Sequence, residues 1–268
     1  AIRSVLKLRY SLMPTLVAAG QRATLDGTPV VQRLDLTWPE LSLQGASRND
    51  QYLFGDGAML VAPIIPFNGS DPVANNATNG KGNSSRTVWV PPGEWQSAWG
   101  GGDVVTGSKN IQVVDCALDQ IPIWHKKGSM LVTTAPALST SEQNWTSLSV
   151  EVFPFSLLEV MAKTTKHASP SPLRTWTSYV YDTKVNLENP PRTSLVLQQH
   201  ATTGLCTLNI GGGAIREWRV RVHLLPGEII GERGLLIDGE PAVFSVIRQK
   251  QYKATALITS EVDEIHGN

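Results

Sequence analysis

The chain has 268 residues, in which 23 Lys and Arg side chains balance 23 Asp and Glu side chains. Nucleic-acid and anionic-membrane binding both favour a basic excess, so this balance predicts neither kind of partner. No apolar run approaches the roughly 20 residues that span a bilayer, so no membrane span is expected. The length fits one large or two small domains.

The first 25 residues predict a helix, because their apolar side chains recur at helical spacing. Pro14 predicts a kink or a new first turn within it, and Asp26-Gly27 predicts its end. Residues 29–36 then predict a strand. Because the chain begins with Ala1 inside this pattern and without an initiator Met, we interpret it as the downstream piece of a longer polypeptide.

Residues 50–65 combine a polar, aromatic turn, a Gly-Asp-Gly break at 55–57 and an apolar run closed by Pro63. A short apolar run between Gly and Pro predicts a strand buried on both faces. Beyond it, short apolar segments alternate with turn clusters, which is typical of antiparallel sandwiches. The expected strands are 59–62, 87–90, 104–105, 111–114, 121–124, 129–132, 148–152, 194–197, 207–210, 218–224, 234–237 and 254–258.

The segment 218–224 alternates apolar and charged residues, which predicts a half-buried strand with one wet face. Arg219 and Arg221 on that face could bind an anion, although solvated charges are the simpler interpretation. The eight Trp residues similarly allow sugar stacking, but core packing is the more common use of Trp in β-rich proteins.

Several motifs occur in an order that resembles the C-terminal third of glycoside hydrolase family 31, the α-glucosidase and α-xylosidase family. The resemblance is good over residues 1 to 135 and loose beyond. It rests on Leu8-Arg9-Tyr10-Ser11-Leu12-Met13-Pro14, Gly27-Thr28-Pro29-Val30, residues 50–65, Arg86 to Pro91 followed by Gly93-Glu94-Trp95, and Leu118 to Ile123 followed by Gly128-Ser129.

This resemblance implies a mainly β chain with three parts. Residues 1–57 would be the last β/α unit of a (β/α)8 barrel, 58–140 a proximal antiparallel β-sandwich and 141–268 a distal antiparallel β-sandwich. One helix and one strand cannot form a barrel alone. We therefore expect an N-terminal portion or subunit of the same enzyme as partner, with a carbohydrate as substrate.

Retaining glycosidases use two carboxylates about 5 Å apart. In the family both lie on middle strands of the barrel, the nucleophile in a Trp-x-Asp-Met-Asn-Glu type motif that this chain lacks. We expect no catalytic residue here and no cofactor, and the five dispersed His residues predict no metal site. The remaining carboxylates of interest have structural interpretations; they are Asp50, Asp56, Asp115, Asp119 and Asp182.

Three residues are candidates for a substrate rim: Arg33, Asp35 and Trp38. The family pattern Pro-Val-x-Arg-Pro-Leu is altered, since Gln32 takes the Arg place and Arg33 the Pro place. Either the Arg has moved by one residue, which turns it to the other face of a strand, or its role is lost. Barrel enzymes place their sites at the C-terminal ends of strands. The alternative is that Asp35 pairs with a nearby Arg and Trp38 packs under a loop.

Four N-glycosylation sequons favour a glycoprotein of the secretory pathway, either extracellular, lysosomal, vacuolar or in the endoplasmic reticulum lumen. They begin at Asn68, Asn76, Asn83 and Asn144. The two cysteines, Cys116 and Cys206, have three interpretations. They could form one disulfide, pair with the missing upstream part, or stay free and buried.

The function predicted is the C-terminal subunit or fragment of a retaining α-glycosidase that acts on α-linked terminal sugars. The alternative is a non-catalytic structural or carbohydrate-binding glycoprotein of the same fold, which the altered Arg33 position slightly favours. Lyase or transglycosylase chemistry on this fold is a third interpretation. The chain itself would complete and support the barrel.

Overall fold

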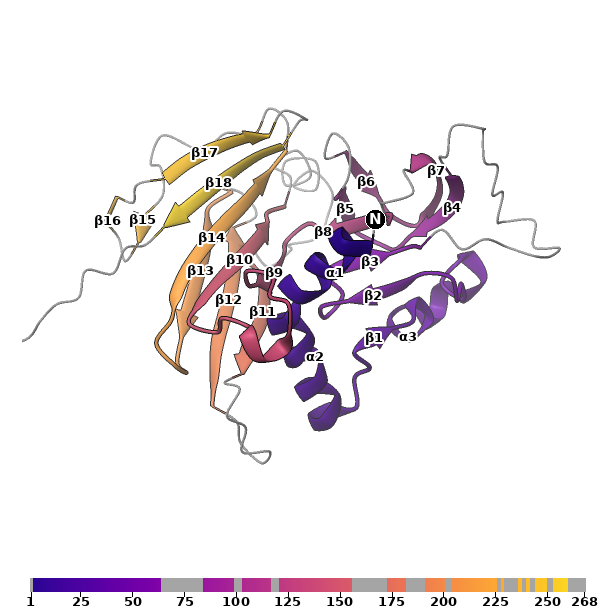
Figure 1. The fold of residues 1–268 in the computed structure, drawn as a ribbon. Helices are drawn as coiled ribbons and strands as arrows, with labels where there is room; N and C mark the ends of the chain where they lie inside the picture. Colours follow the sequence, from indigo (N-terminus) through magenta and orange to yellow (C-terminus); the bar gives the residue numbers. More distant parts are fainter. Residues whose placement is uncertain are drawn as a thin grey trace, which may run out of the picture.

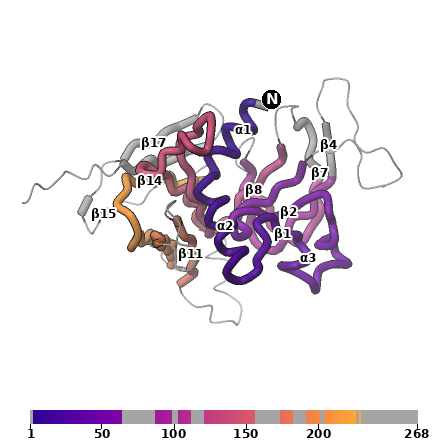
Figure 2. Tube along the Cα trace, turned by 60° about the horizontal axis from the view of Figure 1, so that its bottom comes forward, coloured from indigo at the N-terminus to yellow at the C-terminus, as the bar shows by residue number. Residues whose placement is uncertain are grey.

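The computed structural model describes residues 2–63, 84–98, 103–116, 121–155, 173–181, 191–200, 204–225, 228, 236–237, 240–241, 244–249 and 253–259. The fold is mainly β, as expected, with two β-rich lobes on either side of a pair of helices (Figure 1). The rotated view in Figure 2 shows the same helices beside strands of both lobes. None of the described helices is long and apolar enough to cross a membrane.

The N-terminal helix is divided, which confirms the effect expected of Pro14. Helix α1 spans Ile2–Ser11 and α2 spans Met13–Asp26, with Pro14 in the first turn of α2. Pro tolerates that position because its missing N–H would have no partner there. Gly27 ends α2 in the left-handed conformation, with φ +78°, and its N–H donates to the carbonyl of Ala23.

The strand predicted at residues 29–36 is mostly wrong. Only Val31–Gln32 form a strand, β1, which pairs antiparallel with β2 (Tyr52–Phe54). The chain then turns into helix α3 (Leu34–Thr37) and the 3-10 helix η1 (Pro39–Gln44). Leu34 is fully buried in the core of the lobe, so its burial overrides the strand-like sequence pattern.

The proximal lobe holds a six-stranded sheet in the order β1-β2-β3-β8-β5-β6. Its segment at 52–54, expected as a turn, is strand β2, because Leu53 is buried in the core. A separate pair, β4 and β7, lies in the same lobe. The further strands are β3 (Met59–Val61), β4 (Ser84–Val90), β5 (Glu94–Ser97), β6 (Val104–Thr106), β7 (Lys109–Cys116) and β8 (Ile123–Lys126).

The distal lobe holds a five-stranded sheet, β17-β18-β14-β10-β9, and a three-stranded sheet, β11-β12-β13. A core of alternating apolar side chains joins the two sheets. The elements are β9 (Ser129–Thr133), η2 (Thr140–Glu142), β10 (Ser147–Phe153), β11 (Leu173–Tyr181), β12 (Arg192–His200), β13 (Cys206–Gly211), β14 (Glu217–Leu224), β15 (Leu236–Ile237), β16 (Glu240–Pro241), β17 (Phe244–Gln249) and β18 (Lys253–Thr259).

Two features of the distal lobe correct the sequence prediction. Strands β10 and β14 pair in parallel, so the sandwich is not purely antiparallel. Strand β9 pairs with β10, with Val132 opposite Val150. The two sheets therefore divide at the turn Lys127-Gly128, between β8 and β9, and not at residue 140. Gly128 is required in this turn because a side chain there would overlap the ring of Phe155.

The helices pack against the seam between the lobes and form hydrogen bonds there. The Thr15 hydroxyl donates to the carbonyl of Val132 at 2.7 Å and accepts from its N–H at 3.2 Å. A buried cluster that includes Met59, Leu131 and Phe153 joins strands of both lobes, and Leu8 and Leu12 pack against it. The lobes and the helix pair thus share this one buried cluster, beside the separate core of each lobe.

Candidate functional site

The rim candidates Arg33 and Asp35 form an ion pair at the start of α3. The Arg33 Nε donates to Asp35 Oδ1 at 3.0 Å and its Nη2 lies 2.5 Å from Oδ2. The hydrogen bond and charge of Arg33 lower the pKa of Asp35. The Arg33 side chain is 63 % exposed, so the pair lies on the surface. The alternative in which Asp35 pairs with a nearby arginine is what the structure shows.

Trp38, the third candidate, packs inward. Its ring meets that of Trp89 edge-on, with centroids 6.5 Å apart, and it lies against the proximal core. The Lys126 Nζ lies 5.9 Å from the Trp38 ring, 6.0 Å from that of Trp95 and 5.9 Å from that of Trp176. Burial lowers the pKa of Lys126. Trp38 is therefore a packing residue with a cation over its ring, separate in its contacts from the Arg33–Asp35 pair.

The segment around these residues is unusually apolar on its surface. Among the described residues, five of the nine exposed large hydrophobic side chains lie in the first 57 positions. Leu36 is 61 % exposed and Leu43 is fully exposed. The others are Leu6, Leu25 and Val31. Such side chains indicate an interaction face where they gather into one patch.

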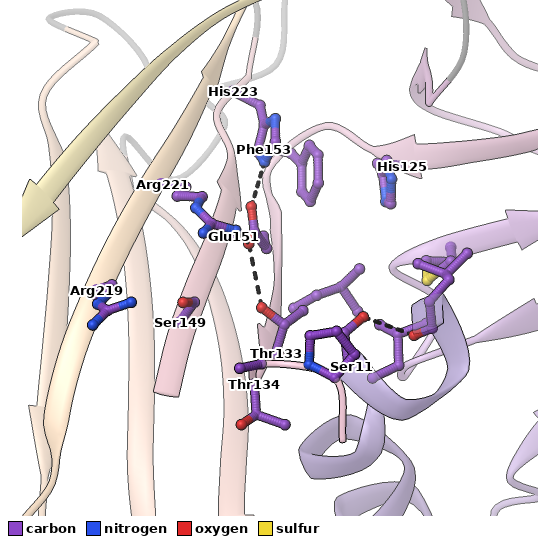
Figure 3. A pocket seen from close by; sticks show the side chains of 16 residues that line it. Ser11, His125, Thr133, Thr134, Ser149, Glu151, Phe153, Arg219, Arg221 and His223 are labelled. Atoms are coloured by element: carbon purple, nitrogen blue, oxygen red, sulfur yellow. Dashed lines mark hydrogen bonds and ion pairs between the residues drawn. The ribbon is translucent and has the colours of Figure 1, made fainter. Parts of the chain in front are cut away.

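A second group of polar residues, which the sequence did not predict, lies at the seam between the lobes. Glu151 of β10, with a side chain 12 % exposed, accepts hydrogen bonds from three residues. Arg221 donates at 2.9 Å and Thr133 at 3.2 Å to Oε1, and His223 Nε2 lies 2.7 Å from Oε2. Figure 3 shows Glu151 between His223 and Thr133.

The hydrogen-bond partners of Glu151 stabilise its ionised carboxylate. Burial alone raises the pKa of a carboxyl group, but the hydrogen bonds and charges of His223 and Arg221 outweigh it, so the pKa of Glu151 is lowered. His223 also stacks on Phe153 at 4.5 Å between centroids, and the opposite face of Phe153 stacks on His125 at 4.2 Å. The stack connects β14 and β10 of the distal lobe with β8 of the proximal lobe.

These residues line a cavity of about 420 Å³. Its walls come from α1, from β9 and the segment after it, and from the outer face of β10 and β14. The wall is mixed in character. It includes the hydroxyl side chains of Ser11, Thr133, Thr134 and Ser149, the charged side chains of Glu151, Arg219 and Arg221, and apolar side chains such as Leu8 and Leu131.

The charged residues singled out from the sequence have structural partners. Arg219 pairs with Glu217 at 3.1 Å and Arg221 with Glu151, which favours the interpretation without a bound anion. Asp50 pairs with Arg48 and Asp56 with Arg22. The side chains of Asp115, Asp119 and Asp182 lie outside the described residues, as do the sequons at Asn68, Asn76 and Asn83. Among the residues that the structure describes, no cluster could hold a metal ion.

The remaining predicted residues are Asn144 and the cysteines. Asn144 is exposed, and its Oδ1 accepts from the N–H of Thr146 at 2.9 Å and from its hydroxyl at 2.7 Å. Cys206 is a free, exposed cysteine, whereas the side chain of Cys116 lies outside the described part of the chain. A disulfide between the two has no support in the structure, and pairing with an upstream segment stays a prediction.

Comparison with known families assigns the central part of the chain. Residues 27–131 match the glycosyl hydrolase family 31 C-terminal domain. This part of the chain therefore resembles the C-terminal domain of family 31 proteins. A curated relative, a 1,6-alpha-glucosyltransferase from Sporosarcina globispora, is 28 % identical over 158 residues, which are 58 % of this chain and 11 % of the relative. The chain thus spans about a tenth of the curated relative that it matches.

Several solved structures share the fold. A dextranase from Flavobacterium johnsoniae superposes with a TM-score of 0.61 and 18 % identity, covering 96 % of this chain and 30 % of its own. A glucosidase II alpha subunit gives 0.59 and 19 %, covering 94 % and 26 %. An alpha-xylosidase from Xanthomonas citri gives 0.54 and 18 %, covering 81 % and 20 %. This chain therefore matches only a minor part of each.

The family 31 match ends at Leu131, inside β9. The Glu151 cluster, on β10 and β14, lies beyond it. The sequence does carry a faint signal, since Glu151 and Arg221 both lie in alternating segments with opposite charge. It could not be used, because the two strands are 70 residues apart and their parallel pairing, which puts Glu151 opposite Arg221, is not predictable from either segment.

Proposed function

We propose that this chain is the C-terminal portion of a retaining α-glycosidase and that residues 1–57 complete a catalytic barrel formed by an upstream polypeptide. The observation that carries the proposal is the family 31 domain at 27–131 together with the exposed apolar surface that precedes and enters it. The catalytic carboxylates would lie upstream, because this chain contains no Trp-x-Asp motif.

The geometry of residues 1–57 supports a docking role. Strand β1 is the edge of its sheet, and the side chain of Val31 within it is half exposed. An open strand edge presents unpaired backbone groups, which proteins normally cover. Burial of large side chains such as Leu36 and Leu43 would each contribute about 1.5–3 kcal/mol to association. A barrel strand upstream would cover both the edge and the side chains.

The names of the relatives support a proposal for the substrate class. Their names specify glucosyl transfer, dextran cleavage, glucosidase activity and xylosidase activity. We therefore propose α-linked terminal glucose or a close relative as substrate, cleaved with retention through a glycosyl-enzyme intermediate. We further propose that the protein enters the secretory pathway and is glycosylated, on the basis of its four sequons.

The test is to produce residues 1–268 together with the upstream polypeptide of the same gene and to assay the assembly on 4-nitrophenyl α-glucoside and α-xyloside. We expect hydrolysis or transfer with retention, read by proton NMR of the first-formed anomer. Each polypeptide produced alone is the control and should be insoluble or inactive. A stable assembly without activity on any α-glycoside would contradict the proposal.

One observation favours a second function, that of a non-catalytic scaffold. The family's Arg place holds Gln32, and Arg33 is directed to Asp35 at the surface. A barrel that had lost its sugar contacts would tolerate this change. The same assay distinguishes the two functions, since a scaffold would assemble normally but turn over no glycoside.

A further inference from the structure

The cavity at the seam has the size and the chemistry of a small-molecule site. Its volume of about 420 Å³ lies within the range of about 300–1,000 Å³ that such sites occupy. It lies on the outer face of the five-stranded sheet, opposite the distal core, with α1 as the facing wall. It is distinct from the Arg33–Asp35 pair, which does not line it.

Hydrogen-bond acceptors and donors both face this cavity. The Ser11 hydroxyl donates to the carbonyl of Leu8 and the Thr134 hydroxyl to that of Asn144. Because each O–H is already used, their oxygens present lone pairs as acceptors. The guanidinium groups of Arg219 and Arg221, 46 % and 41 % exposed, supply donors. Groups that both donate and accept, such as hydroxyls, match this combination.

The charges favour a neutral ligand. Each arginine in the lining has a carboxylate partner, Glu217 for Arg219 and Glu151 for Arg221. The Glu151 carboxylate itself lines the cavity, so an anion would meet repulsion there. The apolar side chains on the α1 side, Leu8 and Leu12, would suit the C–H face of a ring.

We propose that the seam cavity is a binding site for a neutral mono- or disaccharide, held between α1 and the polar face of β10 and β14. The choice of a sugar among hydroxyl-rich ligands rests on the proposed glycosidase function. The site itself rests on the geometry of Glu151 and Arg221. Glu151 acts as a fixed acceptor, because its three neighbours hold its orientation.

The experiment uses the assembled enzyme with its active site saturated by an iminosugar inhibitor. Isothermal titration with maltose and isomaltose should then show one remaining saccharide site per chain. Ser149→Phe fills the cavity from β10 without touching an ion pair, and should weaken this binding at least about tenfold. The matched control is Thr175→Phe, which puts the same ring on an exposed position of β11, and should leave binding unchanged.

A second measurement does not depend on folding of a variant. A maltoside with a diazirine photo-crosslinker should label wild-type peptides from β9 and β10, read by mass spectrometry. The proposal is overturned if no saccharide binds the inhibited enzyme, if binding is equal in both variants, or if labels fall elsewhere. If the inhibitor itself does not bind but cavity labelling persists, the glycosidase function fails and the saccharide site stands.

Discussion

The two lobes are built on different principles. In the proximal lobe every side chain of β3 is buried, because the sheet has apolar layers on both faces. In the distal lobe the strands alternate, so that β12 buries every second side chain. The five-stranded sheet directs its polar face at the seam cavity and its apolar face at the core. The stability of the proximal lobe should therefore depend on close packing of its apolar side chains. The stability of the seam should depend on the ion pairs of Glu151.

The largest effect should follow from cavity formation in the proximal core. Trp89 is 1 % exposed, its backbone is bonded on both sides by Gln51, and Gly45 approaches its ring so closely that no side chain fits there. Trp89→Ala should lower the free energy of unfolding by about 3–5 kcal/mol, measured by urea denaturation. The control is Trp218→Ala in the half-buried distal strand β14, which should cost clearly less. Equal losses would contradict the contrast between the lobes.

Removal of the charge at the seam should have an intermediate effect. Glu151→Gln keeps the shape of the side chain but leaves Arg221 and His223 without a carboxylate. We expect a loss of about 1–3 kcal/mol, below the range for fully buried pairs, because Arg221 is 41 % exposed. Glu217→Gln breaks the surface pair with Arg219 and should cost at most about 1 kcal/mol. Glu151→Gln should therefore lower the denaturation midpoint more than Glu217→Gln does. Identical midpoints would contradict a stabilising role of the Glu151 ion pairs.

The same carboxylate predicts a pH dependence. The pKa of Glu151 is lower in the folded protein than its ordinary value of 4.5, so the unfolded chain takes up the proton first as the pH falls. The stabilisation is therefore fully present above the ordinary pKa and is lost as the pH falls through the folded value. The difference in unfolding free energy between wild type and Glu151→Gln should shrink as the pH falls below about 4.5. A constant difference down to pH 3 would contradict it.

The smallest effect is expected at the rim. The Arg33–Asp35 pair is exposed at its arginine end, and such pairs contribute between about 0 and 1 kcal/mol. Arg33→Ala should leave the denaturation midpoint of the proximal lobe nearly unchanged. In the enzyme that we propose, Arg33→Ala should also leave the KM for 4-nitrophenyl α-glucoside unchanged, because Arg33 forms a surface pair. A raised KM would instead indicate that Arg33 contacts the sugar.

Glycosylation at Asn144 gives a further prediction that does not bear on stability. The side chain is exposed and the Thr146 hydroxyl donates to its Oδ1. In a eukaryotic secretory host, the peptide containing Asn144 should lose a glycan mass on treatment with peptide N-glycosidase, and Thr146→Ala should abolish the modification. An unmodified Asn144 in protein secreted from such a host would contradict the glycosylation that we propose.

Local sequence patterns predict the positions of the helices and strands better than they predict which strands pair with each other. The break at Pro14 and the runs at 59–62 and 148–152 depend on neighbours in sequence, and the structure has them. The parallel pairing of β10 with β14 and the membership of β9 in the distal sheet depend on long-range burial, so they could not be predicted. The strand at 29–36 was wrong because Leu34 is buried in a turn of helix, which no local pattern indicates.

The rim and the seam show the same limit for the candidate site. Arg33, Asp35 and Trp38 were chosen from a family resemblance, and the structure pairs two of them and packs the third. Glu151 and Arg221 form an ion pair only because two segments 70 residues apart in sequence become neighbouring strands. The charges of β14 are visible in the sequence, but their partner on β10 is not.

The most direct test of the central claim is to identify what this chain binds under non-denaturing conditions, by intact mass and N-terminal sequencing of the co-purified polypeptide. We predict a partner, or a contiguous upstream segment, that carries a Trp-x-Asp motif and a later catalytic Asp. A partner in which these carboxylates are replaced, or a chain that purifies as a soluble monomer with nothing bound, would contradict the account and leave the family 31 fold as ancestry without catalysis.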